Sequence, residues 1–206
     1  MLVRRSLVAA ALTAALALGG CAKRAEDSAA GPQADDMSLG NPNAKVSVVE
    51  YASASCPHCA RFAIDVFPAF KAKYVDTGKV RFTLKEYLTD PQALAAAGFL
   101  LARCAGKDRY FEVLDAYFRG QDEMVQTGNV RAVLARIATS PGGLSEAQLD
   151  ACMRDAVAEK ALAARADRHM RIDKIGSTPT FVINGRRVEG EMTMPELDAA
   201  IAKAAG

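Results

Sequence analysis

The chain has 206 residues, of which 50% are hydrophobic and 24% are charged, a balance typical of a globular protein rather than a disordered or collagen-like one. Its 26 basic residues nearly balance its 24 acidic ones, for a net charge of +2. Arg4 and Arg5 lie in a segment that we expect to be removed, and their loss leaves 24 basic against 24 acidic residues. This near-neutral balance gives no electrostatic reason to expect nucleic-acid binding.

Residues 1–20 have the features of an export signal. Two early arginines precede an apolar run over residues 7–18, shorter than the roughly 20 apolar residues that a membrane-spanning helix needs. Residues 18–21, Leu-Gly-Gly-Cys, resemble a bacterial lipobox, in which cleavage leaves a lipid-bearing cysteine. We therefore expect a periplasmic protein, in a compartment where disulfides persist, attached to a membrane through a lipid on Cys21. The alternative is an ordinary signal peptide cleaved slightly later, with no role for Cys21.

The next segment, residues 21–44, is predicted to be a flexible tether. It is rich in Ala, Gly, Asp, Ser, Pro and Gln and has few large apolar side chains to bury. The folded part is then predicted to cover residues 45–206, a usual size for a single domain.

The folded part has the apolar patterns of an α/β domain. Residues 45–51 and 80–84 have the composition of strands, and residues 56–74 between them have helical spacing, with a kink expected at Pro68. Residues at about 90–175 are predicted to form an all-helical insertion, whose last helix runs from residue 145 to residue 171.

After the insertion the pattern returns to strands. Residues 179–183 and 186–189 are predicted to pair as a hairpin, because the Asn-Gly turn between them favours positive φ angles. Thr193 and Glu196 have the spacing of a capping box that opens a last helix.

The motif Cys56-Pro57-His58-Cys59 follows the first predicted strand and opens a helix, which is the arrangement of a redox-active cysteine pair. Unpaired backbone N–H groups and the positive end of the helix dipole favour a thiolate on Cys56. Pro57 suits the first helical position, and His58 would add a donor and partial positive charge beside the sulfur. These effects predict a lowered pKa for Cys56 and therefore an oxidising disulfide. Cys59 is predicted to be the shielded, resolving thiol.

Two other interpretations of the motif are weaker. A structural zinc site needs four ligands, but Cys104 and Cys152 stand alone and the histidines are limited to His58 and His169, so no metal is expected. A purely structural disulfide within the motif is the second alternative.

The motif, the strand Val48-Val49-Glu50-Tyr51 before it and the stretch Gly176–Gly185 far downstream resemble the DsbA family of thioredoxin-fold thiol oxidases. The resemblance covers about residues 45–206. It implies an α/β, thioredoxin-like fold with an all-helical domain inserted between the second and third strands. It also implies that the bond between Thr178 and Pro179 is cis and faces the redox cysteines.

The resemblance further implies roles for residues around the motif. Thr178 and Pro179 would bind a substrate peptide as an extra strand, with the Thr178 side chain tuning the redox sulfurs. From the sequence alone, a trans Pro179 that merely begins a strand is the simpler interpretation. Glu50 matches a family acid that relays the proton of Cys59, with Lys85 as a possible partner across the neighbouring strand; the alternative is a solvent-exposed Glu50.

Cys104 and Cys152 lie among apolar helix positions and have two possible roles. They are either buried, inert thiols or a structural disulfide between two inserted helices, and the oxidising compartment favours the disulfide. His169 is predicted to be a solvated helix residue with no role.

Together these features predict an enzyme, a protein thiol:disulfide oxidoreductase that oxidises cysteine pairs in reduced or unfolded exported proteins through Cys56 and Cys59. It would need no bound cofactor, and a membrane quinone-linked partner, implied by the resemblance, would reoxidise it. No dimerisation segment is evident, so a monomer is expected. The alternatives are a disulfide isomerase or reductase on the same fold, and a non-enzymatic binding or chaperone module.

Overall fold

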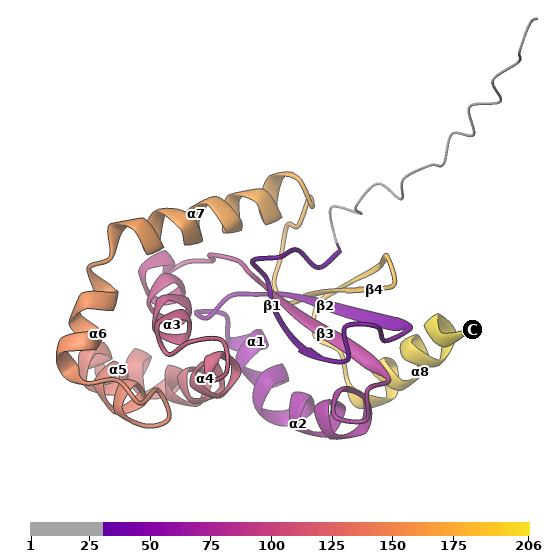
Figure 1. Ribbon diagram of the computed structural model, residues 1–206, viewed down its shortest axis with the longest axis horizontal. Coiled ribbons are helices and arrows are strands. Elements are labelled where there is room, and N and C mark those ends of the chain that lie inside the picture. Colours follow the sequence, from indigo (N-terminus) through magenta and orange to yellow (C-terminus); the bar gives the residue numbers. More distant parts are fainter. Residues whose placement is uncertain (1–30) are drawn as a thin grey trace, which may run out of the picture.

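The computed structural model describes residues 31–206 (Figure 1). The predicted signal sequence, the predicted lipidation site at Cys21 and the first part of the predicted tether lie outside the described residues. Within residues 31–206, none of the helices combines the length and apolar character required to cross a membrane.

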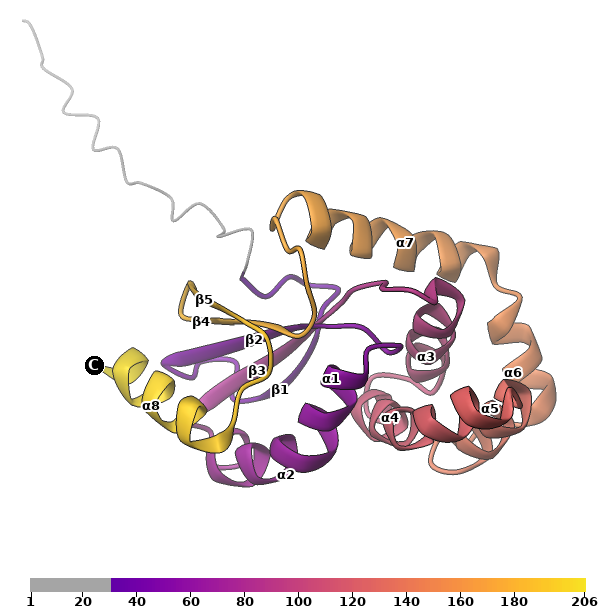
Figure 2. The ribbon, with the colours of Figure 1, turned by 180° about the vertical axis from the view of Figure 1, so that it is seen from behind.

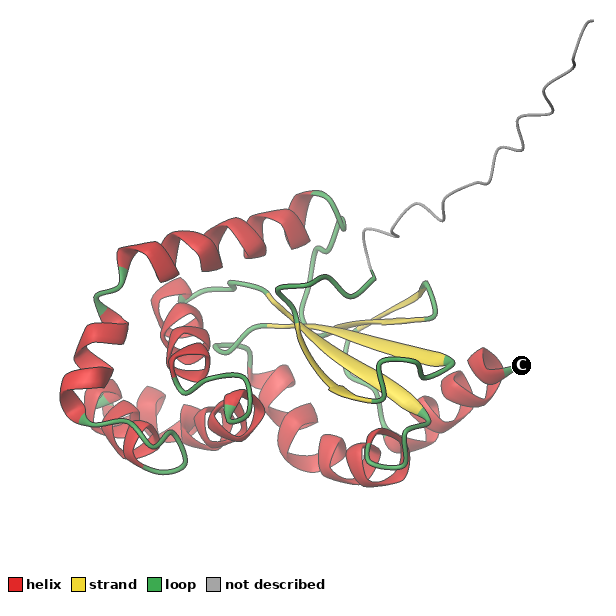
Figure 3. Cartoon of the chain, in the orientation of Figure 1, coloured by secondary structure: helices red, strands yellow, loops and turns green. Residues whose placement is uncertain are grey.

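A five-stranded mixed sheet forms the centre of the domain (Figure 3). The strands, in chain order, are β1 (Met37–Gly40), β2 (Val46–Ala52), β3 (Val80–Glu86), β4 (Thr180–Ile183) and β5 (Arg186–Glu189). In space their order is β1-β3-β2-β4-β5, with β2 and β3 parallel and the other neighbours antiparallel. Strand β2, which leads into the cysteine motif, is therefore the central strand.

Within residues 31–206, the helical segments lie between the strands of this sheet and after the last of them. They are α1 (Pro57–Arg61), η1 (Phe62–Val66), α2 (Phe67–Phe70), η2 (Lys71–Val75), α3 (Gln92–Cys104), α4 (Tyr110–Thr127), α5 (Val130–Thr139), α6 (Glu146–Met153), α7 (Ala156–Arg171) and α8 (Met194–Ala205). The segments from α1 to η2 form one helical run, in which η1 and η2 are π-helical turns. Pro68, where a kink is expected, is the second residue of α2, at the point where the run returns from the π-helical turn η1 to α-helix.

The two views of the ribbon show how the helices cover the sheet. Helices α1, α2 and α8 lie on one side of the sheet, and α7 crosses the other side (Figures 1 and 2). Helices α3–α6 form a compact group beside the end of the sheet where β2 runs into α1 (Figure 2). The main apolar core is continuous from the sheet into this group and includes Phe62, Phe82, Phe99 and Phe181.

The predicted thioredoxin-like fold with a helical insertion is confirmed, with one change in the count of strands. The insertion (α3–α7) separates the strands predicted near residues 80–84 and 179–183. Because β1 precedes both, they are the third and fourth strands of the chain rather than the second and third.

The prediction that the flexible tether continues to residue 44 is wrong. Residues 37–40 form the edge strand β1, which pairs with β3 from Met37 opposite Leu84 to Gly40 opposite Arg81. Backbone hydrogen bonds hold this strand, so its sequence needs few apolar residues, and Met37 alone is buried in the core. The folded domain therefore begins before residue 45.

The single helix predicted from residue 145 to residue 171 is also wrong, because the structure has two helices there. Helix α6 ends at Met153, and Asp155 begins α7 by accepting hydrogen bonds from the backbone N–H groups of Val157 and Ala158. An N-terminal cap inside a helical pattern marks a new start even when the apolar spacing continues.

Candidate active site

The cysteine motif lies at the junction of the central strand and the first helix. Strand β2 ends at Ala52, a short turn follows, and Cys56 is the N-cap of α1 with extended backbone angles. Pro57 occupies the first turn of the helix, where its missing N–H costs no hydrogen bond. Both cysteines of the motif are thiols in this structure, and both are buried.

The surroundings of Cys56 favour its thiolate. A hydrogen bond with the Cys59 thiol, the side chain of Thr178 and the backbone N–H groups of Cys59 and His58 together lower the pKa of Cys56 to about 5, although its partial burial acts in the opposite direction. When protonated, the Cys56 thiol donates a hydrogen bond to the backbone carbonyl oxygen of Thr178 at 3.4 Å, which brings the loop of Thr178 against the sulfur. Cys56 is therefore held mainly by groups at the start of α1 and by one residue from a distant loop.

The second cysteine has the opposite electrostatic environment. Cys59 is fully buried, and burial, the hydrogen bond with Cys56 and the nearby Glu50 carboxylate all raise the pKa of its thiol. At neutral pH the pair therefore carries one negative charge, on Cys56.

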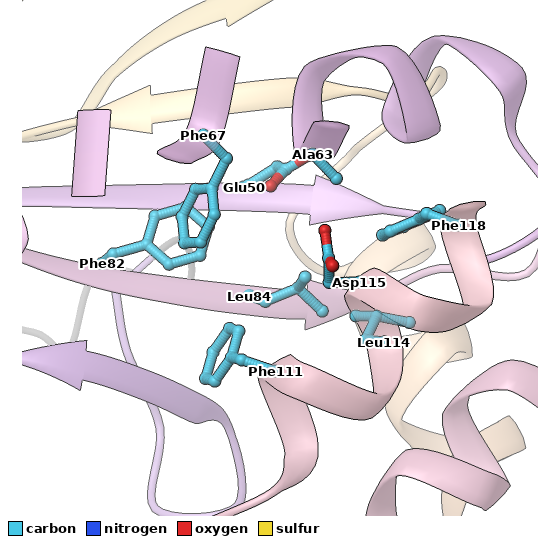
Figure 4. Close-up of a pocket in the computed structure, with 9 residues that line it drawn as sticks. All are labelled: Glu50, Ala63, Phe67, Phe82, Leu84, Phe111, Leu114, Asp115 and Phe118. Atoms are coloured by element: carbon cyan, nitrogen blue, oxygen red, sulfur yellow. The ribbon is translucent and has the colours of Figure 1, made fainter. Parts of the chain in front are cut away.

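Glu50 lies on β2 beneath the motif and is only 4% exposed. Burial, and to a smaller extent the charge on Cys56, raise the pKa of its carboxyl group to about 8. The carboxyl group lines a cavity of about 40 Å³, large enough for a few water molecules, and Asp115 of α4 lines the same cavity (Figure 4). The solvent-exposed alternative for Glu50 is therefore wrong.

The predicted pairing of Glu50 with Lys85 is wrong. In the parallel pair of β2 and β3, Glu50 lies beside Leu84, whereas Lys85 lies beside Tyr51. Neighbouring residues on a strand point to opposite faces, so Lys85 is on the face of the sheet away from Glu50. Its Nζ atom lies 3.0 Å from an oxygen of Asp173.

His169 is also placed differently from its prediction as a solvated residue. It is fully buried on the same face as Lys85, with Nδ1 2.7 Å from the backbone oxygen of Glu86, and it packs edge-on against Tyr51. Burial lowers the pKa of its imidazole. Helix α7 turns this side chain toward the sheet, and His169 takes no part in the cysteine site.

The loop before β4 faces the motif. The peptide bond between Thr178 and Pro179 is cis, and Pro179 is buried. The carbonyl oxygen of Pro179 accepts a hydrogen bond from the N–H of Gly190 at 2.9 Å, which ties this loop to the segment after β5. The structure therefore brings Thr178 and Pro179 beside Cys56, across a separation of 122 residues.

The imidazole of His58 is held by a residue that the sequence did not single out. Its Nδ1 atom contacts the carboxylate of Glu191, which also binds Arg61. The backbone N–H of His58 is one of the groups that lower the pKa of Cys56. Glu191 therefore holds the imidazole, and the expected effect of the imidazole on the sulfur stays a prediction.

A second residue missed by the sequence comes from the helical insertion. The side-chain amide of Gln121, on α4, donates hydrogen bonds to the carbonyl oxygens of Ala54 at 2.5 Å and Cys56 at 3.4 Å. Gln121 is buried, so it fixes the turn that precedes the motif. A lone glutamine within the predicted helical insertion gave no signal for this contact.

Cys104 of α3 and Cys152 of α6 are joined in a disulfide, with their Cα atoms 6.2 Å apart. The bond lies in the helical insertion and links α3 to α6 through two cysteines that are 48 residues apart in the chain. Within residues 31–206, no cluster of three or more Cys, His, Asp or Glu side chains has an arrangement that could hold a metal ion.

Fold and site together define a thioredoxin-fold protein with paired cysteines at a helix start opposite a cis-proline loop. The family model described as Thioredoxin matches residues 33–203. Rickettsia bellii has a relative, named "Putative protein-disulfide oxidoreductase", that is 34% identical over 82% of this chain. The alignment covers 64% of that relative, so this chain spans somewhat under two thirds of its length.

Solved structures give the same picture. The crystal structure of Wolbachia pipientis alpha-DsbA1 has a TM-score of 0.78 and 26% identity, over 85% of this chain and 93% of that one. Oxidised BdbD from Bacillus subtilis shares the fold, with a TM-score of 0.73 and 21% identity over 82% of this chain and 92% of that one. The chain belongs to the DsbA family of thioredoxin-fold thiol:disulfide oxidoreductases.

Proposed function

We propose that this protein oxidises cysteine pairs in exported proteins by dithiol–disulfide exchange through Cys56 and Cys59. The observation that carries the proposal is the opposite environment of the two sulfurs, which lowers the pKa of Cys56 and raises that of Cys59. A stabilised Cys56 thiolate stabilises the dithiol form, so the disulfide form accepts electrons readily. Cys56 is also the better leaving group of the two, because a thiol of lower pKa leaves faster.

The proposed cycle starts from the disulfide form. A substrate thiolate attacks Sγ of Cys56, the bond to Cys59 breaks, and Cys59 leaves with the electron pair and takes up a proton. A second substrate thiolate then attacks the substrate sulfur of the mixed disulfide, and Cys56 leaves as a thiolate. The substrate dithiol has lost two electrons and two protons; the enzyme pair holds both electrons and one of the protons, and the other proton enters the solvent.

Glu50 is proposed to carry the proton of Cys59. Its pKa of about 8 lets it give and take a proton near neutral pH, and its charge acts on the Cys59 thiol. The cavity of about 40 Å³ beside Glu50 gives the proton a place to pass to water (Figure 4). Efficient proton transfer needs a group whose pKa lies near the working pH.

The loop at Thr178 and Pro179 is proposed to hold the substrate. Proline has no N–H, so Pro179 cannot pair with an adjacent strand on that side, and the neighbouring backbone is available to an extended peptide. The substrate would then lie directly over Cys56, because the Thr178 carbonyl oxygen is 3.4 Å from its sulfur.

The direct test follows oxidation of a reduced peptide that contains two cysteines. The purified disulfide form should oxidise one peptide per enzyme and stop, because a further turnover requires an external oxidant. A Cys59→Ser variant should be inactive, and a Cys56→Ser variant should be equally inactive. If the protein instead reshuffles wrong disulfides without net oxidation, the isomerase alternative holds.

The proposal also includes the location of the protein. A quinone-linked membrane partner would reoxidise the dithiol, and a lipid on Cys21 would hold the protein in the periplasm at a membrane, supported by the lipobox resemblance in the sequence. A Cys21→Ser variant should be recovered in the soluble periplasmic fraction. If its membrane partitioning does not change, the lipid anchor is wrong.

A further inference from the structure

The carboxylate of Glu191 lies against two side chains of the motif helix, those of His58 and Arg61. Arg61 Nη2 is 2.5 Å from Glu191 Oε1, and the same oxygen contacts Nδ1 of His58. Arg61 Nη2 also lies 2.5 Å from His58 Nδ1, so the three side chains form one cluster on the exposed side of α1. The two contacts made by Glu191 join residues that are 130 or more positions apart in the chain.

The backbone around Glu191 is fixed by the site. Gly190, which precedes it, has a φ of +90° and donates its N–H to the carbonyl oxygen of Pro179. Met192, which follows it, is buried, and Thr193 is the N-cap of α8. The Glu191 side chain is therefore held beside the motif, on the same segment that supports the proline loop.

Electrostatics link this cluster to the redox sulfur. The pKa of Arg61 is raised first by its hydrogen bond with Glu191, and the negative charge of Cys56 and that of Asp65 also raise it. Arg61 is therefore a cation that both Glu191 and the Cys56 thiolate attract, and His58 is bound to the same carboxylate. In the disulfide form Cys56 carries no charge, so it does not compete with Glu191 for Arg61.

We propose that Glu191 is a positioning residue that moderates the oxidising strength of the Cys56–Cys59 pair, because it holds the His58 side chain and competes with the Cys56 thiolate for Arg61. The competition acts on the dithiol form alone, so Glu191 raises the free energy of that form. Removal of its charge should stabilise the thiolate and make the disulfide a stronger oxidant. The inference rests on the proposed function, in which Cys56 and Cys59 are the exchanging pair.

The test compares Glu191→Gln with Glu189→Gln, a matched loss of charge two residues earlier on exposed β5. The equilibrium of each variant with glutathione and the pKa of Cys56 are measured together. Glu191→Gln should shift the equilibrium toward the dithiol by about threefold, the size of an exposed charge-pair effect, and lower the pKa of Cys56. Glu189→Gln should change both quantities much less, and 1 M salt should reduce the difference between the variants.

A second comparison separates this role from a general change of charge. In a His58→Gln/Arg61→Gln background, the effect of Glu191→Gln should fall to that of Glu189→Gln. An equal effect in both backgrounds, no shift for Glu191→Gln, or a shift toward the disulfide would overturn the inference. A wild-type protein that fails to exchange with glutathione at all would instead contradict the proposed function.

Discussion

The sulfur of Cys56 lies 3.4 Å from the carbonyl oxygen of Thr178, although 122 residues separate them in the chain. The contact joins the start of α1 to the loop before β4, and both lie at the same end of the central sheet. The Thr178 side chain is one of the groups that lower the pKa of Cys56. The electrostatics of the motif therefore depend on a residue outside it.

Replacement of Thr178 by valine should raise the pKa of Cys56. The change keeps the shape of the side chain but removes its hydroxyl, one of the groups that lower the pKa of Cys56. Because this buried hydroxyl oxygen has no hydrogen-bond partner at normal bonding geometry, the expected rise is smaller than a full charged hydrogen bond would give, about one pKa unit or less. The pH dependence of Cys56 alkylation measures this shift. Thr180→Val is the matched control, because the Thr180 hydroxyl binds the Ser177 carbonyl oxygen instead. Equal alkylation profiles for the two variants would exclude a role for the Thr178 hydroxyl.

Replacement of Glu50 by glutamine should change how stability depends on pH. Burial raises the pKa of Glu50 to about 8, whereas an unfolded chain has a value of about 4.3. Between these two pH values the Glu50 carboxyl is protonated in the folded protein but ionised in the unfolded chain. The free energy of unfolding of the dithiol form therefore falls as pH rises through this range, and above pH 8 the total loss due to Glu50 is on the order of 3–5 kcal/mol. Denaturant unfolding at several pH values should show that the free energy of unfolding of Glu50→Gln increases relative to that of wild type as pH rises. Glu112→Gln, a change at an exposed position, is the control and should have the same pH dependence of stability as wild type.

The same variant tests the proton relay. If Glu50 carries the proton of Cys59, the pH profile of the exchange rate should lose the step near pH 8 in Glu50→Gln. Rates measured for the attack of a thiol on the Cys56–Cys59 disulfide, the step in which Cys59 leaves and takes up a proton, would show it. An unchanged profile would remove Glu50 from the mechanism while leaving its effect on stability in place.

The redox cysteines could be predicted from the sequence because their placement is local. A strand followed at once by the motif fixes Cys56 at the helix start. The errors concern side chains whose surroundings depend on distant segments. Lys85 was assigned to the face of Glu50, but the register of β2 and β3 decides that question, and a shift of one residue reverses the face.

Other parts of the site depend on packing that no local pattern carries. The sequence around His169 is typical of a solvent-exposed helix position. His169 is buried only because α7 packs on the sheet. Glu191 reaches His58 because the β4–β5 hairpin returns the chain to α1, across 133 residues. The edge strand β1 is held by backbone pairing, so its side chains gave no strand pattern.

Gln121→Leu should weaken the turn before the motif. The leucine leaves the carbonyl oxygens of Ala54 and Cys56 without the amide that now binds them, which should cost about 1–3 kcal/mol of stability. The equilibrium with glutathione should also change, because the backbone that stabilises the Cys56 thiolate loses its support. Gln126→Leu, at an exposed position of the same helix, is the control. Similar unfolding free energies for the two variants would contradict this role.

The double change Cys104→Ser/Cys152→Ser should lower stability without altering the redox pair. Loss of a cross-link that closes a loop of this length costs about 2–4 kcal/mol, and the bond lies within the helical insertion, between α3 and α6. Denaturant unfolding should reveal the loss, while the glutathione equilibrium of Cys56 and Cys59 stays as in wild type. A changed equilibrium would show that the two disulfides are coupled.

The most direct test of the account is a titration of Cys56 in the dithiol form, followed by thiolate absorbance and checked with a Cys56→Ser variant. The structure predicts a midpoint near pH 5 that disappears in the variant, with Cys59 still protonated at neutral pH. A midpoint close to 8.5, the value of an ordinary cysteine, would contradict the claim that the start of α1 and Thr178 hold this sulfur as an anion.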